Sequence, residues 1–254
     1  MGGARRRRRA AADPLARSPA VIVYGRNAVR EAIRGPREVR RAWATERAAA
    51  DVLDRSAVGV TIVSDPAALE RRCGSPEHQG VCVEVSAYRY ADAAELVGLA
   101  SPMIVALDEI QDPQNLGAVC RTAEAVGVTG VVIAERRSAE VTAAVCRASA
   151  GAVEHLAVAR VRNLADFLLS ARDAGCWSYG AAAGAAVRYD APDYRGGVVL
   201  VLGSEGRGLR PRVAAACDQL VALPLRGRVS SLNVSAAAAA LMYEILRQRL
   251  DSGS

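Results

Sequence analysis

The chain has 254 residues, about half of them apolar, which is enough for one large domain or two smaller ones. Its net charge is +6, and all 33 basic residues are arginine, a bias that a GC-rich genome explains. A basic chain favours a polyanionic partner. The cysteines are scattered without a CxxC pair and there are only two histidines, so a zinc site is not expected. No long apolar run predicts a membrane span, and no signal peptide is visible. These features predict a reduced cytoplasmic protein.

The N-terminal 19 residues form the first segment. They contain five consecutive arginines, Arg5 to Arg9, followed by a mixture of alanine, proline and serine. This composition predicts a disordered basic arm. Contact with RNA, a merely solvated tail and a misassigned start codon all remain open as explanations.

Residues 20–90 form a small α/β unit in this interpretation. Strands are predicted over residues 21–24, 39–45, 60–63 and 80–87. Helices are predicted over residues 27–33, 48–58 and 66–72. The last helix has the strongest start signal, because Asp65 suits the N-cap and Pro66 suits the first helical position.

After a linker over residues 91–101, strands and helices alternate to the end of the chain, over residues 102–250. Strands are predicted over residues 103–107, 130–133, 156–159, 177–181, 198–202 and 219–223. Helices are predicted over residues 116–126, 139–149, 163–174, 210–217 and 234–250. Such alternation predicts a parallel sheet with helices on both faces, whose ligands bind beyond the carboxyl ends of the strands.

Three polar segments fall at those strand ends. They read DEIQDPQNLGAVCR from Asp108, GSEGRGLR from Gly203 and LPLRGRVSSLNVS from Leu223. Helix capping and plain turns explain part of this pattern. However, Glu205 stands between glycines, where packing needs no carboxylate, and the polar residues before the last helix exceed what capping requires. The glycine spacing fits neither a dinucleotide fingerprint nor a P-loop.

These segments, read together, resemble the three sequence motifs of SpoU (TrmH-like) RNA 2′-O-methyltransferases of the SPOUT superfamily. The matching stretches are DPQNLGAVCRTAEAVGV, VLGSEGRGLR and LPLRGRVSSLNVSAAAAALMYE. YGRNAVREAI and HQGVCVEV in the first unit are similar to the accessory domain of bacterial 23S rRNA guanosine 2′-O-methyltransferases and of their antibiotic-resistance relatives.

The resemblance implies a C-terminal trefoil knot, a ribosomal-protein-like RNA-binding N-terminal domain and a homodimer joined through the knot region. It also implies that S-adenosyl-L-methionine is the cofactor, bound mainly by backbone groups at Gly203, Leu223 and Leu232. No metal is implied. The expected partner is RNA, most specifically 23S rRNA, with no membrane involved.

The residues that match the family's catalytic positions are Asn115, Arg121, Glu205, Ser231 and Asn233. An arginine side chain has a pKa above about 12, so we interpret Arg121 as a phosphate clamp rather than a general base. Glu205 is expected to orient an arginine or the substrate ribose, and Ser231 and Asn233 to shape the nucleotide pocket. The proton acceptor remains open.

The predicted function is therefore methylation of a ribose 2′-hydroxyl in RNA, with a guanosine of 23S rRNA as the favoured target. A tRNA target, an rRNA site that confers antibiotic resistance, and a non-catalytic ribosome-assembly protein are the alternatives. The accessory unit weighs against tRNA, and the intact Asn115, Arg121, Glu205 and Asn233 weigh against a non-catalytic protein.

Overall fold

The computed structural model describes residues 20–53, 59–228 and 231–251, so the predicted arm lies outside the described residues. The N-terminal unit is a four-stranded sheet of order β1-β4-β2-β3, in which only β2 and β3 pair in parallel. Its strands are β1 (Val21–Tyr24), β2 (Val39–Ala44), β3 (Val60–Ile62) and β4 (Val81–Val85). Its helices are α1 (Arg26–Arg34), α2 (Glu46–Val52), α3 (Pro66–Cys73) and the 3₁₀ turn η2 (Pro76–His78).

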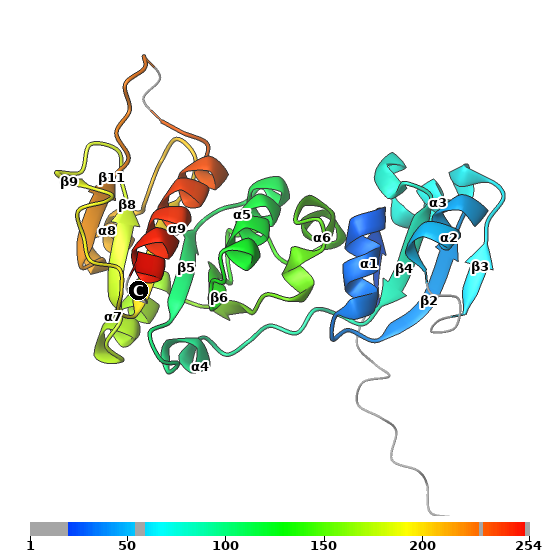
Figure 1. Ribbon diagram of the computed structural model, residues 1–254, viewed down its shortest axis with the longest axis horizontal. Coiled ribbons are helices and arrows are strands. Elements are labelled where there is room, and N and C mark those ends of the chain that lie inside the picture. Colours follow the sequence, from blue (N-terminus) through cyan, green and yellow to red (C-terminus); the bar gives the residue numbers. More distant parts are fainter. Residues whose placement is uncertain (1–19, 54–58, 229–230, 252–254) are drawn as a thin grey trace, which may run out of the picture.

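The C-terminal unit is a seven-stranded parallel sheet of order β7-β6-β5-β10-β8-β11-β9 (Figure 1). Its strands are β5 (Met103–Asp108), β6 (Gly130–Ala134), β7 (Val158–Val161), β8 (Trp177–Ala181), β9 (Val187–Arg188), β10 (Val198–Gly203) and β11 (Gln219–Ala222). Its helical segments are α5 (Pro113–Ala125), α6 (Ala143–Ala148), η3 (Ala152–Glu154), α7 (Leu164–Asp173), α8 (Pro211–Ala216) and α9 (Val234–Leu250), and α4 (Ala93–Val97) lies in the connection between the units.

Helices cover both faces of the parallel sheet, as expected from the sequence. Along β5, Met103, Val105 and Leu107 belong to one apolar cluster with buried residues of α5 and α9. The alternate residues Ile104 and Ala106 pack in a second cluster with α4, α7 and α8. This alternation follows from the two-residue period of a strand, and it explains why strands buried on both faces read as continuous apolar runs.

The predicted fold class is confirmed, but several boundaries were wrong. The helix expected over residues 48–58 begins at Glu46, because Thr45 caps it, and ends at Val52; residues 54–58 lie outside the described part. Strand β7 is shifted two residues beyond its prediction, to Val158–Val161. The two-residue strand β9 was not predicted, since so short an edge strand has no readable period.

Two further helices begin at positions that differ from the prediction. Helix α5 begins at Pro113, three residues before its predicted start, with Asp112 as its N-cap, so Asn115 occupies the third helical position. Helix α6 begins only at Ala143. The preceding residues are held in a loop, because the Ala139 N–H donates to the Ile110 carbonyl (2.8 Å) and the Val141 N–H donates to the Tyr90 hydroxyl (2.9 Å).

The two units share a buried interface. Apolar residues of β1 and α1 belong to the same cluster as Val145 of α6 and Val153 of η3, and in Figure 1 α1 lies beside α6. Inside this interface Arg37 Nε donates to Glu154 Oε2 (2.8 Å), and Arg37 Nη2 also pairs with Glu154 Oε1. Burial is the largest single influence on the pKa of Arg37 and lowers it, but the hydrogen bonds that Arg37 donates to Glu154 and Cys146, together with the charges of these two residues, outweigh burial, so the net shift is upward.

Breaking this pair is expected to destabilise the protein strongly. Glu154→Ala leaves the Arg37 guanidinium buried without its carboxylate, which costs about 3–5 kcal/mol in typical buried pairs. Urea unfolding checks the change in free energy. The matched control is Glu140→Ala, because Glu140 pairs with Arg160 at 3.1 Å but is 55% exposed, and such pairs are worth about 1 kcal/mol or less. Equal losses in the two variants would contradict a structural role for the buried pair.

Candidate active site

Three polar side chains from distant parts of the chain meet beyond the carboxyl ends of β5 and β10. Asn115 lies in the first turn of α5, Glu205 lies in the loop that follows β10, and Asn233 is the N-cap of α9. Asn115 is 90 positions from Glu205 and 118 positions from Asn233 along the chain. The parallel sheet brings them together because β5 and β10 are neighbouring strands.

Hydrogen bonds join these three residues into one cluster. Glu205 Oε1 accepts from Asn115 Nδ2 (3.2 Å) and from Asn233 Nδ2 (2.6 Å), and Asn233 Nδ2 also donates to Asn115 Oδ1 (3.0 Å). Helix capping fixes the Asn233 amide, because its Oδ1 accepts from the Ser235 N–H at 2.8 Å. The amide nitrogen therefore faces Glu205. Among the described residues, Glu205 Oε2 has no hydrogen-bond donor, so it remains able to accept one from a ligand.

A cavity of about 590 Å³ lies between the loop after β10 and the loop after β11. Gly203, Leu223, Leu232 and Ser231, which the sequence places in the site, all line it, and so does Glu205. Its size falls in the usual range for small-molecule sites. The side chains of Leu223 and Leu232 supply apolar walls, while the glycine-rich loop supplies backbone groups, a combination that suits a flat base with polar edges.

The structure shows why a glycine is needed at position 203 within the protein itself. A Cβ atom at Gly203 would lie 2.1 Å from the backbone carbon of Gly208 and 2.3 Å from the Leu209 nitrogen. The loop folds back on itself here, since the Gly208 N–H donates to the Ser204 carbonyl at 2.9 Å. Gly203 is therefore required so that the loop can close, in addition to any close approach of a ligand.

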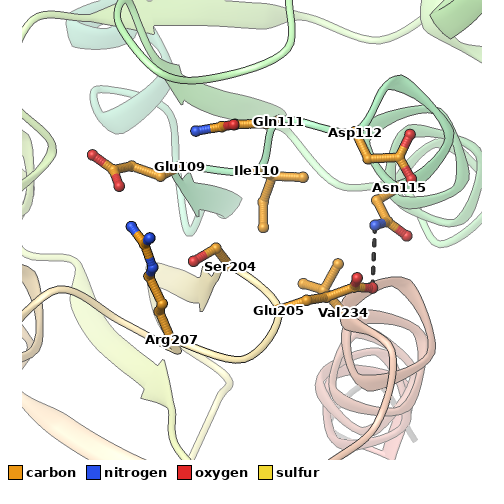
Figure 2. A pocket seen from close by; sticks show the side chains of 9 residues that line it. All are labelled: Glu109, Ile110, Gln111, Asp112, Asn115, Ser204, Glu205, Arg207 and Val234. Carbon is orange, nitrogen blue, oxygen red and sulfur yellow. Dashed lines mark hydrogen bonds between the residues drawn. The ribbon is translucent and has the colours of Figure 1, made fainter.

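A second, more polar cavity of about 300 Å³ adjoins the first and shares Ser204, Glu205, Arg207 and Val234 with it. Figure 2 shows Glu205 bonded to Asn115 on one side of this cavity. On the other side, Arg207 extends from the loop after β10 toward Glu109 at the end of β5. Glu205 thus stands on the wall that separates a cavity with apolar walls from one lined by polar groups.

Asp108 anchors the far end of the Glu205 loop. Its side chain is fully buried and lies in register with Gly203 on the neighbouring strand. Asp108 Oδ2 accepts from the Arg210 N–H (2.8 Å), and Oδ1 accepts from Arg210 Nε (2.8 Å) and pairs with Nη2 (2.7 Å). Arg210 also lies 3.4 Å from Glu109, whose backbone is left-handed (φ 57°). The Asp108 hydrogen bond raises the pKa of Arg210.

Asp108→Asn should therefore loosen this loop and weaken cofactor binding. An asparagine side chain has one acceptor oxygen, so it cannot accept from both the Arg210 side chain and the Arg210 backbone N–H. We therefore expect calorimetry to show at least about a tenfold loss of affinity for S-adenosylmethionine, the cofactor that the sequence resemblance implies. Asp166→Asn is the control, because its partner Arg212 is exposed and far less is expected to change. Affinity equal to wild type in Asp108→Asn would contradict the anchoring role.

The structure does not bring Arg121 into either cavity. Its side chain is exposed on α5, and Arg121 has no ion pair within the described parts of the chain. Sequence reasoning noted the polar cluster after β5 but missed Arg210, which pairs with Asp108 and Glu109, and Arg207, which lines both cavities. A signal existed for both: they are charged residues in the same short loop as Glu205.

The fold and the paired cavities define the class: a parallel α/β protein with a small-molecule site at the carboxyl ends of its strands. The model for the SpoU rRNA methylase family matches residues 102–243, and the model for RNA 2′-O ribose methyltransferase substrate binding matches residues 22–91. Because the first of these covers more than half of the sequence, the chain belongs to the SpoU rRNA methylase family.

Relatives and solved structures agree with this membership. The chain is 40% identical over 237 residues to YacO of Bacillus subtilis, whose name places it in the TrmH family of tRNA/rRNA methyltransferases; the match covers 89% of this chain and 95% of YacO. It is 39% identical over 240 residues to the tRNA/rRNA methyltransferase slr0955 of Synechocystis, a match that covers 90% of this chain but 62% of that longer protein. The S-adenosylmethionine-bound rRNA methyltransferase of Sinorhizobium meliloti superposes with a TM-score of 0.75 at 26% identity, covering 90% of this chain and 87% of the other.

Two expectations are thereby confirmed: the family and its S-adenosylmethionine dependence. Within the described residues, no helix has the length and apolar character that a membrane span requires.

Proposed function

We propose that this protein methylates the ribose 2′-hydroxyl of a guanosine in 23S rRNA. The observation that carries the proposal is the Asn115–Glu205–Asn233 cluster on the wall shared by the two cavities. The larger cavity suits the cofactor, with Gly203, Leu223 and Leu232 around it, and the smaller polar cavity suits a ribose. The substrate-binding unit over residues 22–91 favours a large structured RNA as the target.

The chain's own residues have distinct tasks in this reaction. Bound S-adenosylmethionine supplies an electrophilic methyl group on a sulfonium sulfur. Glu205 Oε2 accepts a hydrogen bond from a ribose hydroxyl, and the side-chain amides of Asn115 and Asn233 hold the carboxylate in position by donating to Oε1. Ser231 lines the larger cavity and helps to shape the pocket that holds the nucleotide. In the transfer, O2′ would form a bond to the methyl carbon as the carbon–sulfur bond breaks with its electron pair going to sulfur, and the hydroxyl proton would pass along its hydrogen bond to Glu205 Oε2 and from there to water.

Arg121 acts in this proposal as a clamp on a substrate phosphate. Its exposed position on α5 suits a large ligand that reaches the site from outside. Its planar guanidinium can pair with two phosphate oxygens at once. The same exposure is compatible with a homodimer joined through the knot region, in which one subunit holds RNA beside the site of the other.

Arg121→Lys separates a clamp from a general base. Lysine keeps the charge but loses the planar fork, and its ammonium group deprotonates more readily than guanidinium. We expect methylation to fall by about 100-fold at every pH while calorimetry shows unchanged cofactor affinity. A rate that climbs with pH toward that of the wild type would identify Arg121 as a base instead.

The proposed target is tested by mapping 2′-O-methyl groups on total RNA from cells with and without the gene. We expect one guanosine of 23S rRNA to lose its methyl group in the deletion strain. Loss of a methyl group from tRNA, or no change in any RNA, would contradict the proposal. Sedimentation of the purified protein tests the dimer, which predicts twice the 26.6 kDa mass of one chain.

A further inference from the structure

The arginines of the C-terminal unit fall into two groups, according to whether a carboxylate neutralises them. Those with an acidic partner are Arg137, Arg160, Arg162, Arg172, Arg188, Arg195, Arg210, Arg212 and Arg247. Arg249 instead donates to backbone carbonyls. Counting partners only within residues 20–53, 59–228 and 231–251, those without an ion pair are Arg121, Arg136, Arg147, Arg207, Arg226 and Arg228.

Four of these unpaired arginines lie along one edge of the sheet. Arg136 follows β6, Arg207 follows β10, and Arg226 and Arg228 follow β11. Because the strands are parallel, these loops all leave the carboxyl edge, and the strand order places β5 between β6 and β10. All four residues are exposed. Strands β6 and β11 themselves lie four strand spacings apart, or about 19 Å.

The two cavities open within this row. Arg207 lines both of them, and the loop that contains Arg136 is held against the site by the bond from the Ala139 N–H to the Ile110 carbonyl. The carboxylates of Glu109 and Glu205 line the smaller cavity. A phosphate is therefore repelled from the cavity and attracted to its rim, which favours a nucleotide that enters with its ribose inward and its phosphates outward.

From these observations, and given the RNA substrate of the proposed function, we propose that Arg136, Arg207, Arg226 and Arg228 form a phosphate-binding surface of the methyltransferase unit. This surface holds the RNA backbone on both sides of the target nucleotide, in addition to the grip of the substrate-binding unit. An unpaired exposed guanidinium binds phosphate without first losing a carboxylate partner, and its fork matches two phosphate oxygens. The paired arginines lack this advantage.

The test uses the full chain with Arg136→Gln, Arg207→Gln, Arg226→Gln and Arg228→Gln as single variants. Arg195→Gln is the matched control: it makes the same change of charge at a 60% exposed arginine that precedes β10, at the opposite edge, and pairs with Asp193. The probe is unmodified 23S rRNA made by transcription. Filter binding from 50 to 500 mM KCl gives the affinity and its salt slope, and circular dichroism checks folding.

Each of the four variants should reduce the magnitude of the slope of log affinity against log salt concentration by about 0.7, as loss of one phosphate contact predicts. Binding should weaken about fourfold or more at 0.15 M salt. The control should match the wild type. If all four variants have the same salt slope as Arg195→Gln, the proposed phosphate-binding surface is contradicted. That result differs from failure of the proposed function, which would appear as a wild-type protein that neither binds this RNA nor methylates it.

Discussion

Gly203→Val is expected to abolish cofactor binding. The new Cβ would meet the Gly208 backbone at 2.1 Å, and two further methyl groups would follow it into the loop, so the turn that walls the larger cavity cannot close. We expect calorimetry to show at least about a 100-fold loss of S-adenosylmethionine affinity. Methylation should fall with it, because the methyl donor no longer binds.

The control for this variant is Gly196→Val, since a Cβ at Gly196 meets no atom within 4 Å and the residue precedes β10 at the opposite edge. Thermal unfolding separates local from global damage. If Gly203→Val unfolds, Gly203→Ala, which adds only the Cβ, provides the same test with less disturbance. A folded Gly203 variant with the affinity of the wild type would refute the role of this turn.

Glu205→Gln should remove most activity without removing the cofactor. The glutamine oxygen can keep the hydrogen bonds from Asn115 and Asn233, which Oε1 accepts now. An amide NH2 group then stands in place of Oε2, and because it only donates, the ribose hydroxyl loses its acceptor. We expect kcat to fall by about 100- to 1,000-fold, the usual effect of losing one group that acts in the transition state. Single-turnover methylation of 23S rRNA measures this change.

Cofactor affinity in Glu205→Gln should stay within about threefold of the wild type, because the larger cavity keeps its shape. The control is Glu124→Gln, which makes the same substitution at an exposed position of α5. Wild-type kcat in Glu205→Gln would show that this carboxylate does not act on the substrate. Lost cofactor affinity with normal kcat at saturation would instead show that Glu205 serves cofactor binding and not the substrate.

Local sequence determined the elements and the edge at which the site lies. Asp65-Pro66 begins α3, and the helix over residues 234–250 was predicted to the residue, since both signals depend on neighbours within a few positions. Apolar runs followed by glycine or polar residues located the strand ends, and in a parallel α/β fold this places the ligand site. The motifs then identified the family and the cofactor.

Only the tertiary structure decided which side chains meet. Asn115, Glu205 and Asn233 come together because β5 and β10 are adjacent, and no local pattern encodes a pairing between strands that are about 95 residues apart, as Met103 and Val198 are. The same adjacency sets Asp108 beside Gly203 and lets it hold Arg210, while helix geometry turns Arg121 outward. Side-chain contacts depend on strand order and packing across the whole sheet, and these are collective properties of the folded chain.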